Sequence, residues 1–93
     1  MIAATIMQAP EHVHWRRFDA EIVVVDLRGG EYFGLSDVAA DAFERLAAGQ
    51  PVGDVVGALL AIYDVERRRL EGDVGDLVKR LMDRGLLVRG ALP

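Results

Sequence analysis

The sequence predicts an α+β domain in which a three-stranded antiparallel sheet is followed by three helices (β-β-β-α-α-α). Two apolar runs, residues 22–27 and 32–35, flank Gly29-Gly30, and a glycine pair between such runs is a strong signal for a β-hairpin. After residue 36 the apolar spacing changes to three and four residues, which is typical of helices. Ninety-three residues are enough for one domain with a core of its own, and too few for two.

The N-terminal part is expected to supply one strand. Residues 1–11 show no clear periodicity and are predicted to be a loose, flexible lead-in. Any order there would come from three apolar side chains: Ile2, Ile6 and Met7. Residues 12–18, HVHWRRF, alternate in polarity and predict the first strand, with a turn near Asp19-Ala20.

The register of the central hairpin follows if Gly29 and Gly30 form a two-residue turn. The cross-strand pairs would then be Arg28 with Glu31, Leu27 with Tyr32, and Asp26 with Phe33. One sheet face would carry Val23, Val25, Leu27, Tyr32 and Gly34, and the other Ile22, Val24, Phe33 and Leu35. With sequential pairing, the second strand of this hairpin lies at an edge of the sheet.

The helices are predicted from apolar stripes and their end signals. Ser36-Asp37 is expected to cap a helix over residues 36–48, which Gly49 ends. Its stripe is Val38, Ala39, Ala42, Phe43 and Leu46.

A second helix of about three turns is expected to start at Pro51. Asp64 is expected to cap a third helix over residues 64–84, with Gly85 as its stop. Residues 86–88 would fold back as an apolar segment, and residues 89–93 would form a short tail.

Composition excludes several classes of function. The chain contains no cysteine, and so no disulfide, thiolate metal site or thiol nucleophile. No apolar run approaches the ~20 residues needed to cross a bilayer, and the N-terminus lacks the features of a signal peptide. We therefore expect a cytoplasmic protein without a membrane partner. The net charge of −4 argues against a general affinity for nucleic acid.

The charge is uneven, with −5 over residues 1–63 and +1 over residues 64–93. The one basic run is Arg67-Arg68-Arg69, which nearby Glu66, Glu71 and Asp73 would partly neutralise. A solvated helix start is the favoured interpretation of this run, ahead of a phosphate site.

Residues suited to catalysis are few. Ser36 is better explained as a helix cap than as a nucleophile. His12 and His14 lie on one strand face, but no third ligand accompanies them, so a metal site is not expected. The sequence predicts neither an enzyme nor a cofactor.

Peptide binding has stronger support. The edge strand Glu31–Leu35 would expose unpaired backbone groups to which an extended peptide can add as a further strand. The third helix could form a wall beside it, and Gly34 would leave room next to Tyr32. That wall would consist of Val74, Leu77 and Leu81, bordered by Asp73, Arg80 and Arg84. The competing interpretation is that the edge is short and covered by the N-terminal arm. The residues alone give the two similar weight.

The run VVVDLRGGEYFGLSDVAADAFERLAAG, followed by the ending YDV…DVGDLVKRLMDRGLL, resembles PqqD-like proteins, the recognition elements of ribosomally made, post-translationally modified peptides. Among these, the chain is most similar to the stand-alone leader-binding subunit of split lasso-peptide maturation systems. The resemblance covers about residues 13–88. It implies a winged-helix-like fold, and it makes residues 12–88 the recognition domain.

The resemblance also implies non-catalytic binding of a precursor's leader peptide as an added strand, with no metal or cofactor. The implied site combines the edge strand Glu31, Tyr32, Phe33, Gly34 and Leu35 with the helix residues Asp73, Val74, Leu77, Arg80, Leu81 and Arg84. The implied partners are the leader, a leader peptidase and a ring-closing cyclase.

Two alternatives remain open at this point. A winged-helix DNA-binding regulator would need a basic wing, whereas the hairpin turn carries Arg28 between Asp26 and Glu31. A scaffold domain of an enzyme complex would use the edge strand to dock a protein. The unpaired edge also leaves the oligomeric state open.

Overall fold

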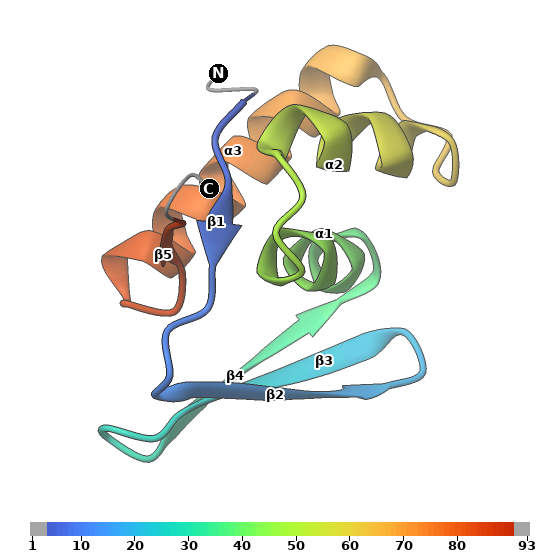
Figure 1. Ribbon diagram of the computed structural model, residues 1–93. Coiled ribbons are helices and arrows are strands. Elements are labelled where there is room, and N and C mark those ends of the chain that lie inside the picture. Colours follow the sequence, from blue (N-terminus) through green and yellow to red (C-terminus); the bar gives the residue numbers. More distant parts are fainter. Residues whose placement is uncertain (1–3, 91–93) are drawn as a thin grey trace.

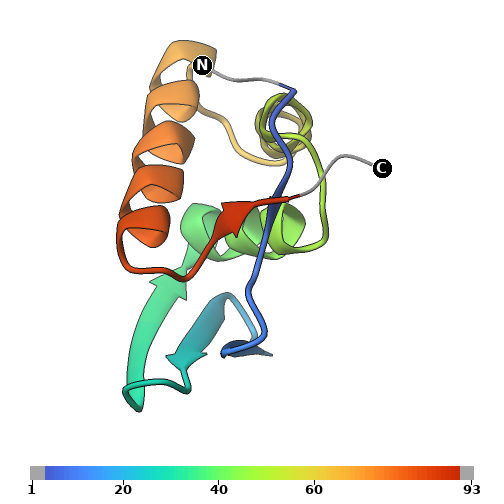
Figure 2. The ribbon, with the colours of Figure 1, turned by 60° about the vertical axis from the view of Figure 1, so that its left-hand side comes forward.

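The computed structural model describes residues 4–90 and confirms the predicted α+β architecture. A three-stranded antiparallel sheet precedes three helices, which all lie on one side of it (Figures 1 and 2). The sheet consists of β2 (Val13–Phe18), β3 (Glu21–Asp26) and β4 (Glu31–Ser36). The helices are α1 (Asp37–Ala47), α2 (Val52–Leu60) and α3 (Arg67–Asp83). Across residues 4–90, no helix is long and apolar enough to traverse a bilayer.

The core lies between the helices and one face of the sheet. Ile22 and Val24 of β3 are fully buried there, and so is Phe43 of α1. Trp15 of β2 meets the Phe43 ring edge to face, at 5.3 Å between centroids, a favoured aromatic geometry. The alternation along β3 therefore places every second side chain against the helices, as the sequence pattern predicts.

The predicted register of the hairpin is wrong by two residues. Asp26 pairs with Glu31, and Val25 pairs with Tyr32, so four residues form the loop instead of two. Only one glycine of the pair, Gly30, has a positive φ (70°), whereas a two-residue turn of the predicted kind needs two such residues. Because the slip is an even number, the predicted sheet faces are kept, and Leu27 and Arg28 move from the ladder into the loop.

The expectation of a loose lead-in over residues 1–11 is wrong for its second half, while Ile2 lies outside the described residues. Met7 is fully buried and begins the two-residue strand β1 (Met7–Gln8). This strand pairs with β5 (Val88–Arg89), so part of the predicted 89–93 tail is ordered too. The backbone oxygen of Thr5 also accepts a hydrogen bond from the N–H of Val52, at 2.9 Å. Two-residue strands are too short to leave a periodic signal in the sequence.

The helix ends agree only in part with their predicted signals. Ser36 occupies the N-cap position of α1, but its side chain makes no capping hydrogen bond. Asp64 is not a cap, because residues 64–66 are irregular and α3 starts at Arg67 with Glu66 as N-cap. Gly49 and Gly85 have positive φ values of 92° and 72°, which confirms both as helix stops.

Candidate functional site

The free edge of β4 is the first component of the candidate site. The strand order is β2-β3-β4, so within residues 4–90 β4 pairs on one side only. Its outer backbone N–H and C=O groups are therefore available to a further strand. Tyr32 on this strand is 74% exposed. The N-terminal strand β1, which might have covered the edge, pairs with β5 instead.

The two faces of β4 differ in character. Phe33 and Leu35 point to the helical side, where both are partly buried and pack against the core. Tyr32 and Gly34 point to the opposite side, and the space that a Cβ on Gly34 would occupy has no atom within 4 Å. A strand added to β4 would likewise direct alternate side chains to the helical side and to the open side.

A pocket of about 620 Å³ between α1 and α3 is the second component. It begins close to the end of β4, because Val38 follows Ser36 by only two residues. Its apolar lining is Val38, Ala39 and Ala42 of α1 with Val74 and Leu77 of α3, and its charged lining is Asp73, Asp76, Lys79, Arg80 and Asp83. An apolar floor with a mixed charged rim suits one apolar side chain of a peptide whose backbone stays near the rim.

The structure places the residues predicted on α3 in three different settings. Asp73, Val74, Leu77 and Arg80 line the pocket. Leu81 is 4% exposed and lies in the core instead of in the pocket lining. Val74 and Leu77 are only 1% and 3% exposed, so these two residues serve the core and the pocket together.

The α1 wall of the pocket is absent from the site predicted from the sequence. Val38, Ala39 and Ala42 were expected to be ordinary core positions of a helix stripe. The sequence did contain one signal for the pocket, which is the small size of Ala39 and Ala42. Two alanines among larger apolar side chains leave space where the helix packs against its neighbour. Recognising it required knowing that α3 packs opposite this stretch.

Arg84 lies over Phe33, with its guanidinium carbon 4.8 Å from the ring centroid. The side chain therefore connects the end of α3 to the helical side of β4 through a cation–π contact. This geometry places the predicted residue Arg84 next to the edge strand, outside the lining of the pocket.

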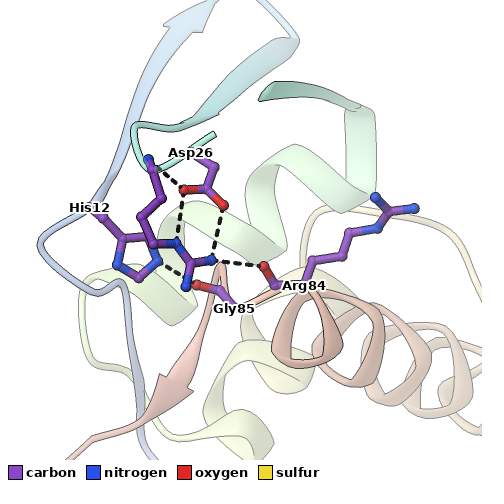
Figure 3. Close-up of polar contacts among 5 residues, drawn as sticks. His12, Asp26, Arg84 and Gly85 are labelled. Atoms are coloured by element: carbon purple, nitrogen blue, oxygen red, sulfur yellow. Dashed lines mark hydrogen bonds and ion pairs between the residues drawn. The ribbon is translucent and has the colours of Figure 1, made fainter. Parts of the chain in front are cut away.

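A polar cluster joins the hairpin turn to the end of α3 (Figure 3). Arg28 donates to both carboxylate oxygens of Asp26, at 3.0–3.2 Å, and its Nη2 donates to the backbone oxygen of Arg84 at 3.4 Å. His12 Nε2 lies 3.0 Å from the backbone oxygen of Gly85. The hydrogen bonds from Arg28 hold the pKa of Asp26 below its usual value, against the opposing effect of its burial.

A second polar cluster joins β2 to α1 at the β2 edge of the sheet. Arg17 donates to Asp41 at 2.6 Å and to Glu44 at 3.4 Å, and Tyr63 donates to Asp41 at 2.5 Å. The hydrogen bond from the Tyr63 hydroxyl, followed by that from Arg17, lowers the pKa of Asp41.

The residues considered for other chemistry do not converge. His12 is engaged by Gly85, whereas His14 is exposed on the far sheet face. In the described part of the chain, no group of three or more His, Asp or Glu side chains is arranged to hold a metal. Arg67, Arg68 and Arg69 are all exposed, in agreement with a solvated helix start.

Comparison with known proteins gives one family and two similar structures. The model of the family described as "Coenzyme PQQ synthesis protein D (PqqD)" matches residues 21–87. A structure described as "TbiB1 in Complex with the TbiA(beta) Leader Peptide" is 30% identical, with a TM-score of 0.83, covering 91% of this chain and 99% of that one. "Lasso peptide synthetase B1 complexed with the leader peptide" is 33% identical, with a TM-score of 0.80, covering 88% and 96%. No curated protein matches the chain in sequence. These similarities do not favour the DNA-binding or scaffold alternatives.

Proposed function

The chain belongs to the PqqD family, and we propose that it binds the leader peptide of a ribosomally made precursor, of the lasso-peptide class, without catalysing a reaction itself. The two similar structures are both complexes with a leader peptide, and both match nearly their whole length. The observation that carries the proposal for this chain is the free edge of β4 beside an apolar pocket.

The leader adds to β4 as a fourth antiparallel or parallel strand, along Glu31–Leu35. Each backbone hydrogen bond of such a strand contributes about 1 kcal/mol, independently of the leader's sequence. One apolar leader side chain that enters the α1–α3 pocket contributes a further ~1.5–3 kcal/mol. The backbone contacts therefore supply affinity, and the pocket supplies the choice among leaders.

The charged residues around the pocket adjust that choice. Arg80 lines the rim together with Asp73, Asp76 and Asp83, and Arg84 lies nearby over Phe33. An acidic leader residue beside Arg80 or Arg84 would bind in a salt-dependent way, because such exposed pairs are screened by ions. Charge at this rim is expected to affect selectivity more than total affinity.

The bound leader is delivered to other enzymes of maturation. We propose a leader peptidase and a ring-closing cyclase as these partners, since a protein that only binds must hand the precursor to enzymes that cut and close it. A ribosomally made precursor emerges in the cytoplasm, and the proposal places this protein in the same compartment.

The test is fluorescence polarisation of labelled leader peptides from short reading frames beside the gene, titrated with the purified protein. Saturable binding of one leader is expected, and its scrambled form should not bind. A leader that is N-methylated at alternate backbone positions separates strand addition from side-chain recognition. One of its two methylation registers should abolish binding, because it removes the N–H groups that face β4. Equal binding of both registers would contradict strand addition.

A further inference from the structure

Asp26 is an unusual residue to find buried at the tip of a hairpin. Among residues 4–90 it is the one charged or polar residue in the buried class, at 7% exposure. A buried carboxylate is costly unless it is paired and hydrogen-bonded. Within the described residues, the hydrogen bonds to its carboxylate all come from Arg28, two residues later in the sequence. Asp26 and Arg28 are close enough in sequence to pair without any contact to the rest of the protein. A contact that Arg28 also makes with another element therefore suggests a further role for the pair.

Arg28 points at the C-terminal end of α3. Its Nη2 reaches the backbone oxygen of Arg84, a carbonyl at the end of a helix, where positive charge is favoured. A Cβ on Gly85 would lie 2.7 Å from the same nitrogen atom, so the guanidinium occupies space that only glycine leaves free. His12, at the entry to β2, contacts the next carbonyl, that of Gly85. The hairpin and the helix end are thus fitted to each other.

The same helix end also covers the edge strand. The backbone oxygen of Arg84 is held by Arg28, and its side chain lies over Phe33 of β4. The separation between β4 and the end of α3 is therefore fixed by one residue that is contacted from both sides. Any strand that adds to β4 must fit that separation.

We propose that Asp26 is a positioning residue for peptide binding, which acts through Arg28 to hold the β3–β4 hairpin against the end of α3. The inference rests on the proposed function, because it concerns the separation between β4 and the end of α3 at the same peptide site. Asp26 does not touch the peptide. It fixes the direction of Arg28, and Arg28 fixes where the edge strand lies relative to the helix.

The competing explanation is that the cluster merely stabilises the fold. The chain offers a matched control, because Arg17 and Asp41 form a similar Arg–Asp contact between β2 and α1, at the opposite edge of the sheet. Asp26→Asn and Asp41→Asn remove the same charge from the same kind of pair. A purely structural role predicts that both variants lose affinity only in proportion to their loss of stability.

The experiment measures Kd and dissociation rate for the leader identified above, together with thermal stability, in the wild type, Asp26→Asn, Arg28→Gln, the Asp26→Asn/Arg28→Gln pair, and Asp41→Asn. Asp26→Asn is expected to weaken binding about tenfold, mainly through faster dissociation. The double variant should be little weaker than Asp26→Asn, because one residue acts through the other. Asp41→Asn should bind within about twofold of the wild type, although it also loses stability.

Two results would overturn the inference. One is wild-type affinity in a folded Asp26→Asn protein. The other is the same ratio of lost affinity to lost stability in Asp26→Asn and in Asp41→Asn. If Asp26→Asn unfolds, Arg28→Lys gives the same comparison, since it keeps the charge but loses the two-pronged contact. Failure of the wild type to bind any leader would instead count against the proposed function.

Discussion

The two outer strands of the sheet, β2 and β4, both have an unpaired edge among the described residues, yet they differ in what lies beside it. On β2 the side chains facing the helices are already engaged: Trp15 packs on Phe43, and Arg17 binds Asp41. On β4, Phe33 and Leu35 face the helices and are only partly buried. The α1–α3 pocket, which has unfilled space, begins at Val38, two residues after the strand ends. An edge becomes a candidate binding site when its neighbouring helices leave room for a guest side chain.

Filling the α1–α3 pocket should remove the space for a guest side chain that distinguishes the β4 edge from the β2 edge. Ala39→Trp places an indole in a space of about 620 Å³ and should weaken leader binding roughly 30- to 100-fold, since the leader's apolar anchor loses its site. Ala48→Trp, at an exposed position beyond the end of α1, is the control and should change affinity less than about twofold. Polarisation titrations measure both. Full affinity in Ala39→Trp would exclude the pocket from the site.

Displacing Arg28 should move the β3–β4 hairpin away from the end of α3 and leave the β2 edge unchanged. Gly85→Ala introduces a Cβ at 2.7 Å from Arg28 and forces alanine into a left-handed conformation, which costs about 1–2 kcal/mol. Gly49→Ala carries the same backbone cost at φ 92°, with no atom within 4 Å of the new Cβ. Urea unfolding should show that Gly85→Ala is the less stable of the two, and only Gly85→Ala should lose leader affinity. Equal effects of the two variants would mean that Arg28 moves aside freely.

Removing the cation over the edge strand should have a smaller effect. Arg84→Ala loses a contact worth about 0.5–1 kcal/mol at an exposed site, and should weaken leader binding by about two- to fivefold. Arg68→Ala, in the exposed first turn of α3, is the matched loss of charge. Titrations at low and high salt would separate the two contributions, because only the loss of general attraction disappears at high salt.

Low pH should modestly reduce the stability that the Asp26 and Asp41 ion pairs contribute. Asp26 and Asp41 both have lowered pKa values in the folded protein. Each carboxylate therefore contributes stability above its unfolded pKa of about 4, and that contribution is lost as the pH falls through the lower, folded pKa. Melting temperatures between pH 6 and pH 2 should fall less steeply in Asp26→Asn and in Asp41→Asn than in the wild type, and least in the double variant. Parallel curves for all four proteins would contradict this linkage.

The order of the elements was predictable from the sequence because it depends on local patterns. The change from alternation to helical spacing after Ser36, and the glycines at 49 and 85, are visible without any tertiary information. The hairpin register was not predictable, because the Asp26 side chain and Arg28 settle the loop as a four-residue one. The pairing of Met7 with Arg89 brings together residues from opposite ends of the chain, and no local pattern reports it.

The edge strand of the candidate site was located from the sequence, but the pocket beside it was located only in part. Helix periodicity identified Val74 and Leu77 as apolar positions, while their partners on α1 depend on how two helices pack. The structure also changes how the site should be tested. Leu77→Asp, a natural choice from the sequence, would place a carboxylate at a position that is 3% exposed and would unfold the protein before it reported on binding.

The pairing of β1 with β5 has a consequence for synthesis. Met7 cannot acquire its strand partner until Arg89, 82 residues later, has been made and has left the ribosome. The three-stranded sheet and α1 are complete in sequence by residue 47, so the free edge of β4 can be assembled long before β1 and β5 pair. We expect the nascent protein to form its hairpin first and to bury Met7 last, because contacts between distant residues carry the larger loop-closure cost.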